Sequence, residues 1–300
     1  MRRMTVTRRS ILQLIGAALA AGRPAQAAPG SQSTSATSLP HPPGGRLGLQ
    51  LYSLRNELKQ DVGGTLTKVR GWGFEEVELA DFPPPKAEER SAALKTAGLR
   101  AVGAFYDYER YRDDFAGAVR DARTLGLEYL ICGWIPHEKS LTRADVERAI
   151  PDFNKWGAAA ARDGLRFAYH VHGYEFAQGP DGTLLDTLLK ETDPRHVEYE
   201  MDVFWVTRGG GDPVALLGKY GTRFRILHLK DMRRGTETGV LTGAAPPETN
   251  VVLGRGIIPW PAVLRAAVKA GVKWYFIEDE NLRAIEQIPQ SIAYLRELKL

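Results

Sequence analysis

Residues 197–202 read VEYEMD, and residues 226–230 read ILHLK. Acidic residues alternate with apolar ones in the first stretch, and His228 and Lys230 alternate with leucine in the second. Successive side chains of a β-strand point to opposite faces, so each stretch predicts a strand with one apolar and one polar face. Such alternation is ordinary in an antiparallel sheet whose one face meets water. The segments between these stretches decide whether the sheet is antiparallel or parallel.

From Arg46 onward the chain alternates short strand-like stretches with helical ones. Strands are expected at 47–52, 75–79, 100–105, 128–132, 166–171, 197–202, 225–230 and 274–278. Helices are expected at 62–71, 86–97, 112–125, 142–163, 182–191, 212–220, 260–270 and 288–298. Helical connections argue against an antiparallel sheet, and no G-x-G-x-x-G motif follows the first strand to favour an open doubly wound sheet. Eight β-then-α units over 46–300 predict a single (β/α)8 TIM barrel.

In a closed parallel barrel, the polar faces of these strands point into the lumen. Burying several charges there is costly unless they pair or bind a cation. Barrel enzymes place their active sites at the carboxyl ends of the strands. Asp202, His228 and Glu278 end the last three expected strands. Two carboxylates and an imidazole suit a divalent metal such as Mn, Mg, Co or Zn.

The first 27 residues have the composition of an export signal. They hold five arginines and no acid, and Arg8-Arg9 precedes an apolar stretch that ends near Ala21. Residues 25–27 read AQA, which a signal peptidase accepts. We expect a twin-arginine-type signal peptide, export machinery as a partner, and a periplasmic or secreted protein. An amphipathic first helix and general secretion are the alternatives. Residues 28–45, rich in Ser, Pro and Gly, predict a flexible linker.

Composition excludes several classes of protein. The net charge is +4, but without the leader 35 basic residues face 36 acidic ones, so the broad positive field of a nucleic-acid-binding protein is missing. One cysteine, Cys132, excludes an internal disulfide and multi-cysteine metal sites. No apolar run approaches the roughly 20 residues of a membrane anchor. The oligomeric state stays open.

Seven fragments in order resemble the sugar phosphate isomerase/epimerase group of the xylose-isomerase-like TIM barrels. They are LGLQLYSLR, VELA, YHVHGYEF, EYEMDVFWV, ILHLKDM, VLGRGIIPW and WYFIEDE, and the resemblance covers roughly residues 46–299. It implies one divalent metal ion held by an acid after the fifth strand together with Asp202, His228 and Glu278. The fifth-strand ligand is ambiguous, since His170 stands where many relatives have Glu. We expect Glu175 to be this ligand, with His170 as the alternative.

The resemblance also implies a reaction. A metal on adjacent hydroxyl and carbonyl groups of a sugar acidifies the C–H between them, and a carboxylate moves the proton. Glu175 and Glu278 would act as ligands and bases, and Lys230 would steady the oxyanion unless it only pairs with Glu200. His172 would relay protons. Four further residues are expected to contact a small sugar substrate: His170, Gln50, Glu78 and Trp205. Glu200 and Asp231 are expected to orient the ligands.

Four functions remain open on this basis. The first is a metal-dependent isomerase or epimerase of a sugar or keto-sugar that works through an enediolate. The second is a lyase that dehydrates a keto-inositol or cleaves a 3-keto-glycoside. Endonuclease action at abasic DNA conflicts with the mature charge and the expected export. The fourth is an exported sugar-binding module without catalysis.

Overall fold

The computed structural model describes residue 39 and residues 42–80, 86–179 and 182–300. The expected signal peptide, residues 1–27, lies outside these residues, as does most of the expected linker. These described residues belong to one compact unit. None of the described helices combines the length and the apolar character that crossing a bilayer requires.

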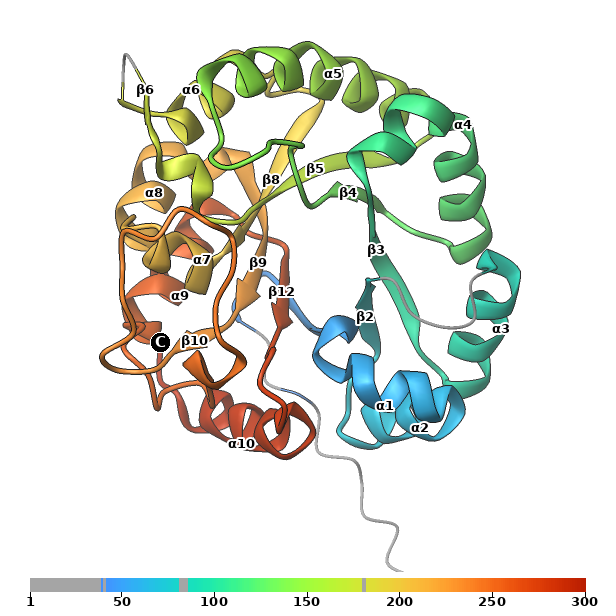
Figure 1. The fold of residues 1–300 in the computed structure, drawn as a ribbon. Helices are drawn as coiled ribbons and strands as arrows, with labels where there is room; N and C mark the ends of the chain where they lie inside the picture. The colour runs from blue at the N-terminus through green and yellow to red at the C-terminus, as the bar shows by residue number, and fades with distance from the viewer. Residues whose placement is uncertain (1–38, 40–41, 81–85, 180–181) are drawn as a thin grey trace, which may run out of the picture. The chain divides into compact units, whose positions relative to one another are not determined.

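Eight parallel strands close into a barrel, in the order β1-β2-β3-β4-β5-β8-β9-β12 (Figure 1). They are β1 (Arg46–Gln50), β2 (Glu76–Leu79), β3 (Arg100–Tyr106), β4 (Tyr129–Cys132), β5 (Arg166–Val171), β8 (Val197–Asp202), β9 (Phe224–Leu229) and β12 (Trp274–Ile277). Strand β12 closes the barrel by pairing in parallel with both β1 and β9. The predicted TIM barrel is confirmed, and every strand lies within two residues of its expected limits.

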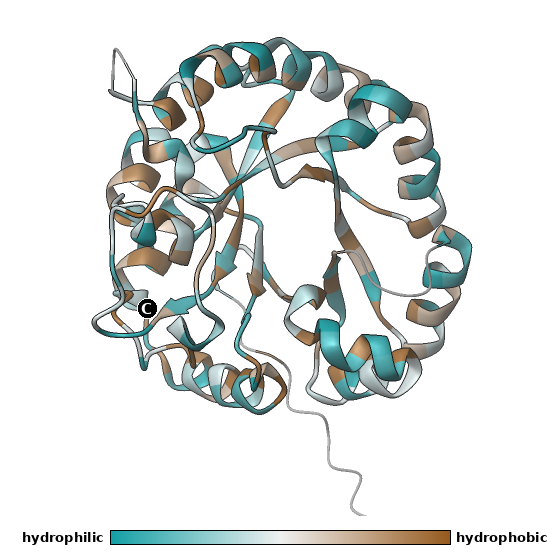
Figure 2. Ribbon diagram, viewed as in Figure 1, coloured by the Kyte–Doolittle hydropathy of each residue, from teal (hydrophilic) through white to brown (hydrophobic). Residues whose placement is uncertain are grey.

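Helices surround the ring of strands (Figure 1). They are α1 (Arg55–Gln60), α2 (Val62–Gly71), α3 (Ala87–Ala97), α4 (Tyr108–Leu125), α5 (Arg143–Arg162), α6 (Leu184–Glu191), α7 (Val203–Arg208), α8 (Pro213–Tyr220), α9 (Trp260–Ala270) and α10 (Ala284–Glu297). Hydrophilic and hydrophobic residues alternate along them, as expected of helices with one face on a sheet (Figure 2). The short helices α1 and α7 were not expected from the sequence.

Short elements decorate the connections between strands and helices. The 3₁₀ turns are η1 (Leu51–Leu54), η2 (Tyr174–Phe176), η3 (Gly221–Arg223) and η4 (Pro247–Thr249). Two small antiparallel pairs join β6 (Gln178–Gly179) to β7 (Gly182–Thr183) and β10 (Asp231–Met232) to β11 (Asn250–Val251). The second pair begins and ends a long loop after β9, close to the carboxyl end of the barrel.

An apolar layer fills the barrel lumen below the polar strand ends. This lumen layer consists of Val102, Tyr129, Ile131, Ala168, Ile226, Trp274 and Phe276. The rings of Trp274 and Phe276 stack with their centroids 6.2 Å apart. The layer separates the amino end of the lumen from its carboxyl end.

The described end of the expected linker packs on the barrel. Leu39 is only 5% exposed and belongs to the main core between sheet and helices, and Pro42 is also buried. Gly45 lies so close to Tyr275 that an added Cβ would be 2.3 Å from the ring. The last residues before β1 are therefore fixed by apolar contacts that their Ser/Pro/Gly-rich surroundings did not indicate.

Closure between β1 and β12 depends on a glycine. Gly48 pairs with Phe276, and a Cβ at residue 48 would lie 2.5 Å from the Phe276 ring and 2.8 Å from the backbone oxygen of Glu76. We expect Gly48→Ala to lower the free energy of unfolding by about 1–3 kcal/mol through overpacking. Urea unfolding followed by circular dichroism measures this change. Gly71→Ala is the matched control, because nothing lies within 4 Å of its added Cβ. Equal stability of the two variants would contradict the prediction.

Candidate active site

Three ligand-type side chains meet at the carboxyl end of the barrel. Asp202 ends β8 directly opposite His228 on β9, and Glu278 follows β12. One ligand atom from each of the three lies within 4.8 Å of the others, and all three residues are buried. The structure therefore brings together the residues that the sequence analysis took from the last three strands.

His228 lies at the centre of this group. Its Nε2 is 2.7 Å from Glu78 Oε2 and 2.9 Å from Glu200 Oε1. Its Nδ1 is 3.1 Å from Glu278 Oε2 and 3.7 Å from Asp202 Oδ2. One imidazole is thus surrounded by four carboxylates from three strands, β2, β8 and β12.

Lys230 is the second buried cation of the site. Its Nζ lies 3.2 Å from Glu278 Oε2 and 3.5 Å from Asp202 Oδ2, and it also donates to Glu280. The ammonium group lies 4.8 Å from the centre of the Trp205 ring. The salt bridge with Glu200 that the sequence left open is replaced by these contacts.

Carboxylates outnumber cations in this group, which fits a further cation. Five acids face only His228 and Lys230: Glu78, Glu200, Asp202, Glu278 and Glu280. Among the described residues, the buried Oε1 of Glu78 lacks a hydrogen-bond partner, whereas Glu200 Oε1 and Asp202 Oδ2 contact the cations His228 and Lys230. An unpartnered buried carboxylate oxygen is costly, and a divalent ion would satisfy it. The donor set of carboxylates and imidazole fits such an ion.

A second group with ligand spacing lies beside the first. One ligand atom each of His170, Glu200 and His228 lies within 4.8 Å of the others. His170 Nδ1 contacts Glu200 Oε2 at 2.9 Å. His170 is thus within reach of the centre, as the alternative fifth-strand ligand should be. Glu200, which was expected only to orient ligands, belongs to this group as well.

The charges shift one another's pKa values in opposite directions. Burial lowers the pKa of His228, but the carboxylates of Glu200, Glu78 and Glu278 outweigh burial and raise it well above the usual imidazole value. Burial raises the pKa of Glu278, but Lys230 and His228 hold it well below its usual range. Burial and the Glu78 carboxylate raise the pKa of Glu200. Without a metal, His228 therefore acts as the counter-ion of the surrounding acids.

A cavity of about 330 Å³ opens beside this group. It is lined by Gln50, Tyr52, Ala80, Phe105, His170, His172, Trp205, Gly243, Glu278 and Glu280. Five residues that the sequence analysis assigned to the site therefore line the cavity: Gln50, His170, His172, Trp205 and Glu278. Burial and the charge of Lys230 lower the pKa of His172 to about 4, which keeps this imidazole neutral near pH 7.

Glu175 is not where the sequence analysis placed it. In the described chain it belongs to neither ligand group and does not line the cavity. Gly173, in the left-handed region at φ 86°, turns the chain after β5 into η2. The carboxylate of Glu175 consequently accepts hydrogen bonds from the Tyr169 hydroxyl at 2.5 Å and the His172 amide at 3.1 Å. This arrangement does not support Glu175 as the fifth-strand ligand or as a base.

Glu78 and Lys230 also differ from their expected roles. Glu78 is fully buried, accepts from Gln50 Nε2 at 2.9 Å, and does not line the cavity. This position does not support the expected contact of Glu78 with a substrate. Lys230 is also fully buried and does not line the cavity. Its ammonium group contacts carboxylates, which leaves it no open position for an oxyanion of the substrate.

Residues outside the barrel strands also line the cavity, among them Glu280 and Gly243. Glu280 lines the wall beside Glu278. Gly243 reaches the cavity from the long loop after β9, where Arg208 on α7 donates to the backbone oxygens of Glu237 and Ala244. The several glycines of this loop are the sequence feature that could indicate its approach to the cavity.

Asp231 fastens the returning end of the same loop. Its carboxylate accepts hydrogen bonds from the amides of Met232, Gly254, Gly256 and Ile258, and from the indole of Trp260 at 2.9 Å. Asp231 therefore holds the loop, whereas the sequence analysis expected it to orient a ligand.

Comparison with known proteins identifies the family. A family model described as xylose isomerase-like TIM barrel matches residues 66–298. The chain belongs to this family. It is similar to an inosose dehydratase of Geobacillus thermodenitrificans, with 29% identity over 167 residues that cover 52% of this chain and 55% of that protein. It spans between about a third and three fifths of the length of the first curated relatives it matches.

Solved structures share the fold of this family member. A sugar phosphate isomerase/epimerase from Parabacteroides distasonis has a TM-score of 0.69 and 24% identity, covering 84% of this chain and 98% of that one. A xylose isomerase-like TIM barrel protein from Mycobacterium smegmatis, solved in complex with magnesium, has a TM-score of 0.64 and 16% identity, covering 83% and 94%. At these identities the likeness concerns the fold.

Replacing Asp231 tests its role in the loop. Asp231→Ala leaves several buried N–H donors without an acceptor, so we expect a loss of about 2–4 kcal/mol in the free energy of unfolding. Thermal and urea unfolding measure the loss. The control is Asp113→Ala, because Asp113 is exposed and pairs only with Arg112, and it should change stability by less than about 0.5 kcal/mol. Similar small effects of both substitutions would refute the role of Asp231.

Proposed function

We propose that the chain is a divalent-metal-dependent lyase that dehydrates a keto-inositol or a related keto-sugar. The observation that carries this proposal is the buried group of Asp202, His228 and Glu278, in which carboxylates outnumber cations, next to a cavity. Similarity to inosose dehydratases supports elimination over the isomerisation that the sequence analysis preferred.

The metal would be held by Asp202, His228 and Glu278, with His170 nearest as a further donor. A bound divalent ion supplies Lewis-acid polarisation of the substrate carbonyl, which acidifies the neighbouring C–H. Lys230 keeps the carboxylates of Asp202 and Glu278 in place, because its ammonium group contacts both. The chain itself therefore provides a rigid set of donors.

Two side chains are placed to move protons. Glu278 lines the cavity and can take the proton from the carbon next to the carbonyl. The electron pair of that C–H bond forms the new C=C bond as the C–O bond to the β-hydroxyl breaks. His172 also lines the cavity, and its Nδ1 has no hydrogen-bond partner among the described residues. As a neutral imidazole, it can pass the proton that Glu278 has taken up on to the departing hydroxyl group, which leaves as water.

Aromatic walls would hold the ring of the substrate. Phe105, Trp205 and Tyr52 line the cavity, and Tyr52 is 40% exposed. Flat aromatic faces pack against the C–H faces of sugars and cyclitols and keep water from the reacting carbon.

Isomerisation or epimerisation is the second candidate function. The same proton abstraction gives these products when the proton returns to the neighbouring carbon or to the opposite face. The sequence fragments that resemble sugar phosphate isomerases/epimerases favour this candidate. Elimination and isomerisation differ in whether a C–O bond breaks, so one assay separates them.

Metal content tests the proposed centre. Purified wild-type protein should bind about one divalent ion per chain, measured by elemental mass spectrometry after dialysis against Mn²⁺, Mg²⁺ or Zn²⁺. His228→Ala and Asp202→Ala each remove a donor and should weaken binding on the order of 100-fold. His137→Ala is the control, because His137 stacks on Trp134 outside both ligand groups. Metal retention in all three variants would disprove the centre.

Product analysis tests the reaction. In deuterium oxide, metal-loaded protein and a keto-inositol should give an unsaturated product, seen by ultraviolet absorbance and NMR. His172→Ala should lower kcat by roughly 10²–10⁴-fold while metal content stays unchanged, because only proton transfer is lost. Deuterium uptake without an alkene would favour isomerisation. No uptake and no alkene across a panel of keto-inositols and keto-sugars would reject both candidates.

A further inference from the structure

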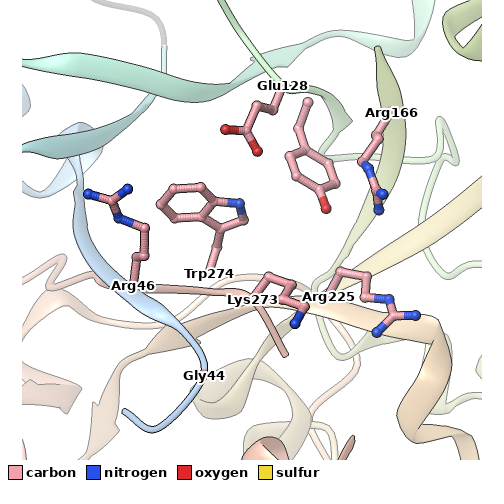
Figure 3. A pocket seen from close by; sticks show the side chains of 8 residues that line it. Gly44, Arg46, Glu128, Arg166, Arg225, Lys273 and Trp274 are labelled. Carbon is pink, nitrogen blue, oxygen red and sulfur yellow. The ribbon is translucent and has the colours of Figure 1, made fainter. Parts of the chain in front are cut away.

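A second and larger cavity lies at the opposite end of the barrel. Its volume is about 460 Å³, and its wall includes four cations and one acid (Figure 3). These are Arg46, Arg166, Arg225 and Lys273, with Glu128. Each lies at or next to the amino-terminal start of a strand. The lumen layer separates this amino-end cavity from the candidate active site, and no residue of its wall takes part in the proposed function.

Charges around the amino end of the barrel follow a regular order. From β2 to β9, one charged residue per strand alternates in sign: Glu76, Arg100, Glu128, Arg166, Glu198 and Arg225. The next two strands break the alternation, because β12 is preceded by Lys273 and β1 begins with Arg46. Three neighbouring positions are therefore positive.

Backbone hydrogen bonds show that these three cations are true neighbours. The amide of Lys273 donates to the oxygen of Arg225 at 2.9 Å, and the amide of Arg46 donates to the oxygen of Lys273 at 2.9 Å. In Figure 3 the side chains of Lys273 and Arg225 lie next to each other on one side of the cavity. The positive charges are thus concentrated on one side of the ring.

The acids of the ring are already paired with other cations. Glu76 contacts Arg46 at 2.7 Å and Arg100 at 3.5 Å. Glu128 contacts Arg100 at 2.9 Å, and Glu198 contacts Arg166. Each acid therefore has at least one cation from a neighbouring strand.

Arg225 and Lys273 have no such acid. Arg225 donates from Nη1 to the backbone oxygen of Gly271 at 3.1 Å, which leaves its charge uncompensated. Within the described parts of the chain, no carboxylate oxygen lies within 4.0 Å of the charged nitrogens of either residue. One anion is missing from the alternating ring at this position.

The floor of the amino-end cavity strengthens the field of these charges. Trp274 and Tyr129, which are 6% and 1% exposed, belong to both the wall and the lumen layer. Aromatic and aliphatic groups beneath the cations lower the local dielectric constant, so an anion there is attracted more strongly than at an open surface.

We propose that the amino-end cavity binds a phosphate-type dianion, held mainly by Arg225 and Lys273. The planar guanidinium group of arginine binds two oxygens of such an anion at once, and lysine adds a point charge. Arg46 borders the same site, although Glu76 already shares its charge. The anion takes the place of the acid that the alternating ring lacks.

Calorimetric titration of the full chain with orthophosphate tests the site. The key variant is the double substitution Arg225→Gln/Lys273→Gln, which removes both uncompensated charges. The control is Arg265→Gln/Lys155→Gln, which removes the same charge from exposed positions on α9 and α5. Glycerol 3-phosphate, titrated in parallel, distinguishes a phosphate ester from free phosphate as the natural source.

We expect wild type and control to bind phosphate equally, and the key variant to bind at least about tenfold more weakly. Phosphate should also raise the Tm of the wild type but not that of the key variant, because ligand binding stabilises only a protein that binds. Whichever of glycerol 3-phosphate and orthophosphate binds more tightly indicates whether the natural ligand is a phosphate ester or free phosphate. Absence of binding at about 10 mM phosphate would overturn the proposal. Undiminished binding in the key variant would also overturn it, since the metal centre is intact there.

Discussion

An excess of buried carboxylate over buried cation is the constraint on which the carboxyl end of this barrel depends. Barrel closure places Glu78, Glu200, Asp202 and Glu278 around one imidazole, and Lys230 is the only other cation in contact with them among the described residues. Acids so placed cannot all stay charged in a low-dielectric interior without further compensation. Hydrogen bonds from neighbouring residues, such as that from Gln50 to Glu78, hold these acidic side chains in one arrangement.

The two ends of the lumen carry opposite excess charges. At the carboxyl end acids exceed cations, and at the amino end three cations adjoin one another. The lumen layer keeps the two sets apart, so neither neutralises the other. One barrel therefore carries a group with excess negative charge and a group with excess positive charge on the same closed sheet. Strand β12 connects them, with Lys273 before its first residue and Glu278 after its last.

Side-chain alternation predicted the barrel and the polar face of each strand. It did not predict which of the side chains that face the lumen also line the cavity. Glu78 points into the lumen as expected, yet it lies beneath Gln50 and away from the cavity. Glu175 does not line the cavity, because the turn at Gly173 redirects the chain and the Glu175 carboxylate accepts a hydrogen bond from the buried Tyr169 hydroxyl. Helix α7 was missed because nearly all of its residues are buried, which leaves no polar face to reveal a helical period.

Two buried side chains, Asp231 and Arg208, bind the loop after β9. Asp231 gathers its returning end, and Arg208 holds its outgoing half through backbone oxygens, which any residue type can supply. Only Gly243 of this loop lines the cavity among the described residues. The outer part of the loop can thus change in sequence during evolution, or be redesigned, without disturbing the donors beneath it.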